Sequence, residues 1–199
     1  MNWAVAHRPL GHLVMHAAVL ARGDHALMLP GFPGAGKSTL CAALAHCRNW
    51  RLFSDELAIY APALGRLLPH PRPISLKNDS IARVAEMPGA RLGPIHRATR
   101  KGDISLAACP PVAVQAAGQG AALRWVLFPR FETGAAASCE EISRAEAFVL
   151  ISEQSFNQER LGEAGFDALC ALLDGARCFQ LRYGSTAAGL DLVDGICLP

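Results

Sequence analysis

The chain has 199 residues, of which 51% are hydrophobic and 18% charged, and its formal net charge at pH 7 is +2. This length fits one domain with a sizeable core, and the composition excludes an intrinsically disordered chain. So small a charge excess, without a block of like charges, gives no reason to expect a nucleic-acid or membrane partner. The seven cysteines include no CxxC pair, which argues against a disulfide framework or structural zinc and for reduced thiols in a cytoplasmic protein.

The first half of the chain is predicted to consist of short strands around one helix. Apolar runs with little helical period predict strands at 12–19, 26–29, 50–54 and 57–60. Gly23 provides a turn between the first two, which therefore form a hairpin. The run STLCAALAHC after Lys37 is rich in good helix formers and predicts a helix to about Cys47. The four prolines between 62 and 73 predict a second hairpin.

The chain from residue 79 onward is predicted to be richer in helix. Helical spacing of apolar residues predicts helices at 79–87, 143–152, 167–173 and 187–196. Asp79 or Ser80 is expected to cap the first of these helices. Strands are predicted at 123–128 and 178–181. The uncharged run 104–123 lacks the apolar continuity of a membrane-spanning helix and predicts a core strand or two plus a surface loop.

These elements alternate without an internal repeat or a low-complexity linker. The pattern predicts a single α/β domain over residues 1–199. Because the strands are short and several form hairpins, we expect a mixed sheet with flanking helices rather than a purely parallel one.

A glycine-rich loop carries the strongest functional signal, since it matches the Walker A pattern GxxxxGK[ST] at every fixed position. Its residues are Gly31, Phe32, Pro33, Gly34, Ala35, Gly36, Lys37, Ser38 and Thr39. Glycines let successive backbone N–H groups point at phosphate oxygens, and the following helix adds the positive end of its dipole. In such a P-loop, Lys37 reaches the β- and γ-phosphates and Ser38 ligates Mg²⁺. We therefore expect ATP with Mg²⁺ as the ligand, although no base-reading motif separates ATP from GTP.

A magnesium site of this kind usually takes a second oxygen from the end of a neighbouring strand. Asp55 follows the predicted strand 50–54 and is the expected ligand; the alternative is a turn or cap residue. Glu56 is adjacent, but we expect it to face the other way, because side chains alternate along a strand.

Four segments together resemble the HPr kinase-related proteins, above all the group often called HprK-related kinase A. The segments read HAAVLARGDHALMLPGFPGAGKSTLCAALA, WRLFSDELAIY, RPISLKNDS and RWVLFPRF. That group is similar to the catalytic domain of bacterial HPr kinase/phosphorylase, and the resemblance covers nearly the whole chain. It implies a P-loop kinase fold related to phosphoenolpyruvate carboxykinase and a homo-oligomer.

The resemblance also implies an activity, namely transfer of the γ-phosphoryl group of ATP to a serine-type hydroxyl of a protein or small molecule. His16 matches the family's histidine on the strand before the P-loop, and Asp55 and Glu56 match its acidic pair. One carboxylate would contact the metal, and the other or the same one would accept the hydroxyl proton with His16 nearby. The chain has no RGLG-type signature, so the resemblance does not extend to a phosphorylase reaction or to HPr as the substrate. Related proteins carry an extra N-terminal segment, and the chain is therefore expected to be short or a fragment.

Two further polar segments are weaker candidates for substrate binding. Arg72, Lys77 and Asn78 lie together in one of them, and fixed cations there would stabilise charge on a transferring phosphoryl group. A solvated loop is the alternative.

The second segment is the densest basic cluster of the chain, formed by His96, Arg97, Arg100 and Lys101. A solvated surface loop is the favoured interpretation there, with phosphate or acidic-substrate binding as the alternative. Arg130, just past the strand 123–128, is a candidate because the ends of strands often face a ligand crevice.

Three functional hypotheses differ in what they require of the site. A kinase requires Lys37, Asp55 and His16. A non-catalytic nucleotide-binding regulatory module requires Lys37 but tolerates loss of the other two. An ATPase coupled to motion also needs a water-positioning residue and an arginine finger, neither of which is evident in the sequence.

Overall fold

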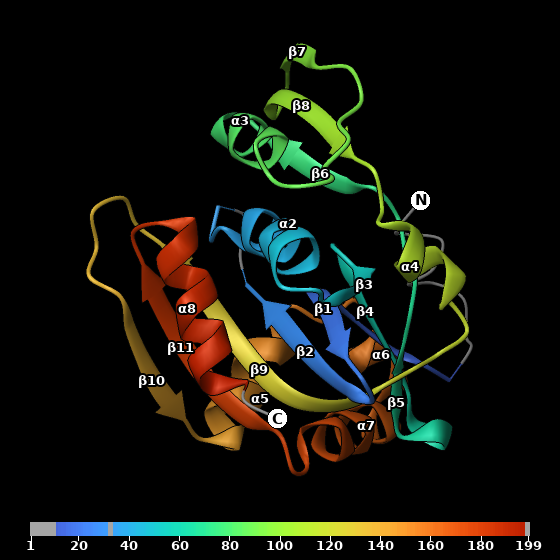
Figure 1. Ribbon diagram of the computed structural model, residues 1–199. Helices are drawn as coiled ribbons and strands as arrows, with labels where there is room; N and C mark the ends of the chain where they lie inside the picture. The colour runs from blue at the N-terminus through green and yellow to red at the C-terminus, as the bar shows by residue number, and fades with distance from the viewer. Residues whose placement is uncertain (1–10, 32–33, 198–199) are drawn as a thin grey trace.

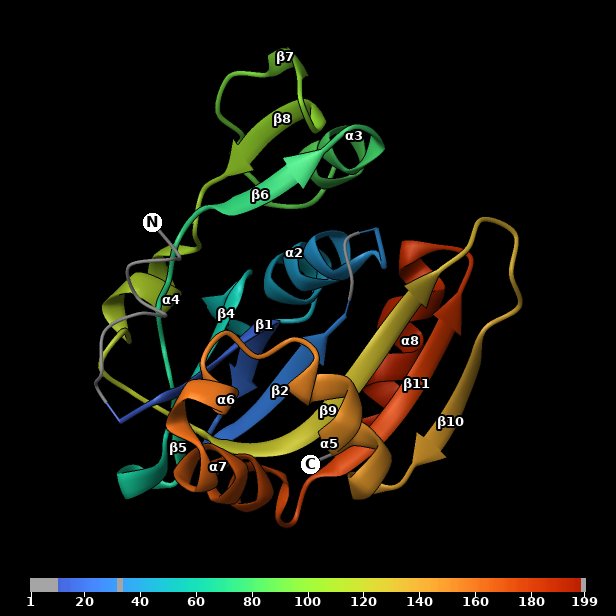
Figure 2. The ribbon, with the colours of Figure 1, turned by 180° about the vertical axis from the view of Figure 1, so that it is seen from behind.

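The computed structural model describes residues 11–31 and 34–197 and shows a mixed β-sheet with helices on both faces (Figures 1 and 2). Eight strands form this main sheet among the described residues, and three more form a small sheet beyond one of its faces. The prediction of an α/β chain with a mixed sheet and flanking helices is confirmed.

The main sheet has the strand order β10-β11-β9-β2-β1-β4-β5, with β3 paired to β1 beside this path. The strands are β1 (Leu13–Arg22), β2 (His25–Pro30), β3 (Arg51–Ser54), β4 (Leu57–Ala61), β5 (Arg66–Leu68), β9 (Ala122–Phe131), β10 (Ser138–Ile142) and β11 (Arg177–Tyr183). Strands β2, β9 and β11 are parallel, whereas the other pairings are antiparallel. The carboxyl ends of β2, β9 and β11 therefore meet at one edge of the sheet.

Helices cover both faces of the main sheet because its central strands are apolar on both sides. Helices α2 (Lys37–Cys47) and α8 (Thr186–Ile196) lie on one face, packed on a core that includes Leu29 and Leu127. The other face is covered by α5 (Arg144–Ser152), α6 (Gln158–Leu161) and α7 (Glu163–Leu173), as Figure 2 shows. Among the described residues, no helix is long and apolar enough to cross a membrane.

The small sheet has the order β6-β8-β7 and lies across α2 from the main sheet (Figure 1). It contains β6 (Ile74–Lys77), β7 (His96–Thr99) and β8 (Gly102–Ala107), and the helix α3 (Asp79–Ala85) packs on it. Both β6 and α3 contact α2. The chain enters this sheet through residues 69–73 and leaves it through residues 108–110, two stretches without regular structure.

Most predicted elements are confirmed to within a few residues, including the β1–β2 hairpin and the pairing of β4 with β5. The predicted cap of α3 is wrong, because Asn78 occupies the N-cap position. The Ser80 hydroxyl instead accepts from the Lys77 amide at 2.7 Å and donates to the Lys77 carbonyl at 2.6 Å.

The expectation for residues 104–123 is only partly right. One strand, β8, ends at Ala107, and the expected surface loop contains the short helix α4 (Pro111–Gln115). Proline at the first helical position costs no hydrogen bond, which allows this helix to begin where the sequence suggested a loop.

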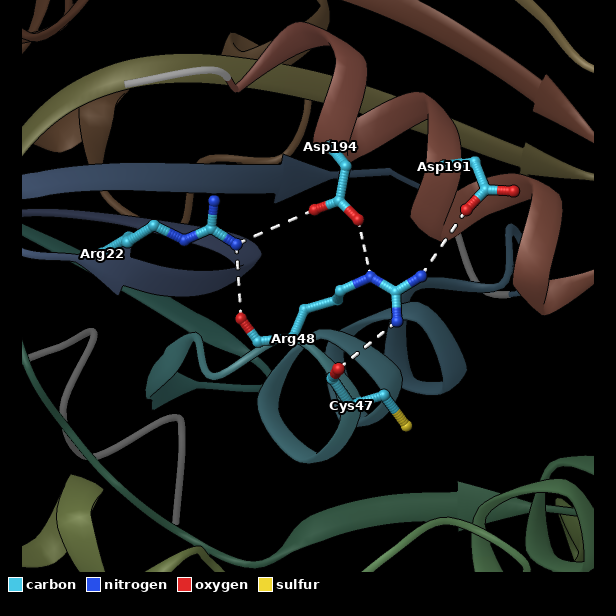
Figure 3. Close-up of polar contacts among 5 residues, drawn as sticks. All are labelled: Arg22, Cys47, Arg48, Asp191 and Asp194. Carbon is cyan, nitrogen blue, oxygen red and sulfur yellow. Dashed lines mark hydrogen bonds and ion pairs between the residues drawn. The ribbon is translucent and has the colours of Figure 1, made fainter.

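The C-terminal end of α2 is fastened to α8 by Arg48, as Figure 3 shows. The Arg48 Nε donates to Asp194 at 2.6 Å, and its other nitrogens lie 3.5 Å from Asp191 and 3.3 Å from the Cys47 carbonyl. Arg22 from the β1–β2 hairpin donates to the Arg48 carbonyl at 3.2 Å. These contacts fix the axis of α2 at the end opposite its glycine-rich N-terminus.

The first half of β1 is held on one side by a segment that substitutes for a strand. The backbone of His16 donates to the Gln154 carbonyl at 2.7 Å, and Phe156 donates to the Val14 carbonyl at 2.9 Å. The buried Asn157 side chain continues the pattern, because it accepts from the Val14 amide and donates to the His12 carbonyl, both at 2.9 Å. This segment therefore fixes the position of His16.

We predict that Asn157→Leu lowers the free energy of unfolding by about 3 kcal/mol, because it leaves a buried amide of β1 without an acceptor. Urea unfolding measures the loss. Glu159→Ala, an exposed position two residues further on, is the control and should change stability by less than about 0.5 kcal/mol. Equal effects of the two substitutions would contradict the proposed role of Asn157.

Candidate functional site

A cavity of about 450 Å³ opens at the N-terminus of α2, between the main sheet and the small sheet. The predicted site residues that line it are His16, Gly34, Gly36, Lys37, Ser38, Thr39, Asp55, Glu56, Lys77, Asn78 and Lys101. These residues come from segments between positions 16 and 101. The fold therefore brings together segments that are far apart in the chain.

Helix α2 begins at Lys37, directly after Gly36 in a left-handed conformation with φ of 86°. The first N–H groups of a helix have no partner within it, and here they face the cavity together with the positive end of the helix dipole. Phe32 and Pro33 of the predicted loop lie outside the described residues. Gly31 and Ala35 line a second cavity on the other side of the loop instead.

Gly36 is closely surrounded by side chains from β9 and β11. A Cβ atom added at Gly36 would lie 2.9 Å from the Cβ of Phe131 and 3.0 Å from the hydroxyl of Tyr183. The loop can approach the ends of these strands only because this residue has no side chain.

Lys37 is buried, with 8% of its surface exposed. Its Nζ donates a hydrogen bond to the carbonyl of Gly31 at the other end of the loop. Burial lowers the pKa of Lys37, and the negative charge of Asp55 opposes this shift. The lysine thus lies where an anion held by the loop would meet a poorly solvated positive charge.

Asp55 and Glu56 lie in the tight turn between β3 and β4, and both line the cavity. The Ser54 hydroxyl accepts hydrogen bonds from the amides of Glu56 at 3.2 Å and Leu57 at 3.0 Å, which bends the chain. The expectation that the two carboxylates face different ways is therefore wrong, because strand alternation does not continue through this turn.

Asp55 is 5% exposed and is the most perturbed carboxylate of the cavity. Burial raises its pKa to about 6, against the opposing effects of a hydrogen bond from the Ser75 amide, at 3.0 Å, and of the nearby Ser38 hydroxyl. Its Oδ1 is buried without a hydrogen-bond partner. A buried carboxylate oxygen without a donor is costly unless a cation or a proton satisfies it.

The oxygen atoms of Ser38 and Asp55 fit a magnesium ion. They are hard donors, and Mg²⁺ in nucleotide sites takes one or two protein oxygens and completes its shell with water and phosphate oxygens. Such a site does not require three or more His, Cys, Asp or Glu side chains. The described residues contain no group of that kind.

His16 projects from β1 toward the same end of the cavity, half-buried beside Glu56. Burial and the nearby charge of Lys37 lower its pKa, whereas the charge of Glu56 and a hydrogen bond to the Glu56 backbone oppose the shift. The imidazole is therefore neutral at pH 7 and able to accept a proton. Its ring meets Phe156 edge-on at 6.1 Å between centroids.

The small sheet supplies the opposite wall of the cavity. Lys77 and Asn78 reach it from the end of β6, and Lys101 reaches it from the turn between β7 and β8. Asn78 also accepts from the Asp103 amide at 3.1 Å and so joins the two strand ends.

Several weaker candidates lie outside this cavity. His96, Arg97 and Arg100 do not line it, so Lys101 alone of that basic cluster contributes. Arg72 does not line it either. Arg130 lines the second cavity, of about 710 Å³, and pairs with Glu132.

Eight lining residues were not predicted as site residues from the sequence. They are Leu40, Ser75, Asp79, Ser80, Arg83, Phe131, Tyr183 and Thr186. Phe131 and Tyr183 lie at the carboxyl ends of parallel strands, where ligands of such sheets bind. Their place at the ends of parallel strands could have identified Phe131 and Tyr183 as site residues. Recognising that place requires the strand order, which the sequence alone does not give.

In comparisons with known proteins, no protein-family model matches the chain, and no curated protein matches it significantly.

We predict that Gly36→Ala is more damaging than Gly34→Ala, although both glycines have positive φ. Alanine at Gly34 meets no atom within 4 Å and should cost about 1 kcal/mol of backbone strain. Alanine at Gly36 adds the clash with Phe131 and should cost about 2–4 kcal/mol. Urea unfolding of the two variants measures the difference, and equal losses would show that Gly36 is not tightly packed.

We predict that Asp55→Asn stabilises the protein at neutral pH in buffer without divalent cations. An acid whose pKa is raised on folding from 3.8 to about 6 binds its proton more tightly when folded. Its contribution to stability is therefore complete below pH 4 and is lost as the pH rises through 6. Two pKa units correspond to about 3 kcal/mol, which is the largest gain expected from asparagine at pH 7.5.

Denaturant unfolding at pH 4 and pH 7.5 tests this expectation. The difference between Asp55→Asn and the wild type should widen with pH, and Asp79→Asn, an exposed carboxylate of the same cavity, controls for net charge. A difference that stays constant between the two pH values would contradict the buried-carboxylate account.

Proposed function

We propose that this protein is a kinase that transfers the γ-phosphoryl group of ATP to a serine-type hydroxyl of a protein or small molecule. The observation that carries the proposal is the buried, partnerless oxygen of Asp55 in the same cavity as Lys37, Ser38 and the N-terminus of α2. A phosphate-binding loop alone would not need this carboxylate. The resemblance of four sequence segments to the HPr kinase-related proteins supports the same proposal.

In the proposed reaction, the loop and the helix N-terminus bind the phosphates, and Lys37 stabilises the negative charge on the β- and γ-phosphates. Ser38 and Asp55 would hold Mg²⁺, which would neutralise charge on the same phosphates. Lys77 and Lys101 lie on the facing wall, where they can contact the transferring group or the acceptor.

The acceptor oxygen forms a bond to the γ-phosphorus as the bond from that phosphorus to the β–γ bridging oxygen breaks, and ADP leaves. The hydroxyl proton passes to the pair formed by His16 and Glu56. The neutral imidazole can take up this proton, and the adjacent carboxylate then stabilises the imidazolium.

The competing proposal, a non-catalytic nucleotide-binding module, makes different demands on the same residues. It needs Lys37 and the loop, but it gives no role to a buried Asp55 or to a neutral His16. The geometry therefore supports the kinase better.

The test is label transfer from ATP to dephosphorylated proteins and metabolites of the native cells. Label at the γ-phosphate should move to an acceptor, whereas label at the α-phosphate should not. Lys37→Ala and Asp55→Asn should each lower the transfer at least about 100-fold, the loss typical when a charge-stabilising group is removed.

ATP binding is measured on the same preparations by calorimetry with Mg²⁺. Asp55→Asn should retain binding within roughly tenfold, since the loop is intact. Tight ATP binding without γ-label transfer above the level of Lys37→Ala would overturn the kinase and leave the regulatory module.

A further inference from the structure

The strand order separates two chemically different groups of lining residues. His16 on β1 and Asp55 and Glu56 before β4, the groups proposed to act on the γ-phosphate, come from one side of β2. Phe131 at the end of β9 comes from the other side of β2, and Arg83 of α3 faces it from the small sheet. A triphosphate bound along the loop with its γ-phosphate on the acidic side of β2 directs its nucleoside toward the Phe131 side.

Phe131 is held firmly in place. It is the last residue of β9, and its side chain is half-buried against the loop, with its Cβ 2.9 Å from the position of a Cβ on Gly36. Its ring meets the buried ring of Tyr183 edge-on at 5.8 Å between centroids. The face of Phe131 is thus fixed by contacts on the loop side and the sheet side.

Arg83 covers Phe131 from the other wall. Its guanidinium lies 4.8 Å from the centre of the Phe131 ring, although Arg83 belongs to α3 beside the small sheet and Phe131 to the main sheet. Arg83 is exposed, and its side chain makes neither a hydrogen bond nor an ion pair with another of the described residues. Arginine guanidinium groups and aromatic rings at a cavity wall are side chains on which proteins hold nucleobases.

We propose that Phe131 and Arg83 form the nucleobase site and that the purine of the bound triphosphate stacks on this pair. The inference rests on the proposed function, because the phosphates must occupy the loop for the base to reach this pair. Stacking contacts only the face of the base and makes no hydrogen bond to its edge. Adenine and guanine should therefore be bound with similar affinity.

The test compares ATP with inorganic tripolyphosphate, which has the phosphates but no base, by calorimetry in the presence of Mg²⁺. The wild type should bind ATP at least about tenfold more tightly than tripolyphosphate, and GTP within about tenfold of ATP. Arg83→Ala should weaken ATP about 5- to 30-fold while changing tripolyphosphate affinity less than about twofold. Arg97→Ala, on the small sheet but outside the cavity, is the matched control and should change neither affinity.

Phe131 is tested by two substitutions, because a smaller side chain could disturb the loop. Phe131→Leu should weaken ATP selectively, and Phe131→Trp, which retains an aromatic face, should restore ATP affinity to within about threefold of the wild type. Equal weakening of ATP and tripolyphosphate by Arg83→Ala would show that Arg83 binds phosphate and would overturn the assignment. An unchanged ATP affinity in that variant would overturn it as well.

Failure of this inference is distinguishable from failure of the kinase proposal. Lys37→Ala should weaken both ATP and tripolyphosphate, because it acts on the phosphates. If it weakens neither, the loop is not the binding site and the proposed function fails. If it weakens both while Arg83→Ala has no effect, only the nucleobase site is wrong.

Discussion

The close approach of Gly36 to Phe131 and Tyr183 is the contact on which the rest of the site depends. It sets the N-terminus of α2 against the carboxyl ends of β9 and β11, next to the end of β2. The other end of the helix is fixed independently, by the contacts of Arg48 with α8. A helix held at both ends presents its unpaired N–H groups in one direction, which is what a phosphate site requires.

Burial of charge is the second constraint on the cavity. Lys37 and Asp55 are both almost fully buried, and each shifts the pKa of the other toward its charged form while burial acts in the opposite sense. Such an arrangement is expensive in a folded protein unless ligands complete it. The same low solvation strengthens every electrostatic contact made there, so the feature that costs stability would also favour stabilisation of phosphoryl charge in the proposed reaction.

The sequence was sufficient to predict the parts of the fold and site that depend on local pattern. The loop from Gly31 to Thr39 and Asp55 at the end of a strand follow from residue types and spacing, and the α/β class follows from the order of the elements. Strand β10 was missed because its residues, SCEEI, are mostly exposed and carry no apolar alternation.

Two misses at the site arise from tertiary structure. Arg83 and Phe131 meet only because two sheets face each other across α2, and no spacing in the sequence encodes that distance. The orientation of Glu56 was mispredicted because a single hydroxyl, that of Ser54, replaces an extended strand by a turn.

The two connections to the small sheet are rich in proline. Residues 69–73 contain Pro69, Pro71 and Pro73, and the exit stretch ends at Pro110, followed by Pro111. Each proline fixes one backbone angle and narrows the range of conformations open to the connection. The wall that carries Lys77, Arg83 and Lys101 is thus preorganised opposite the loop, and less conformational entropy is lost when a ligand bridges the two walls.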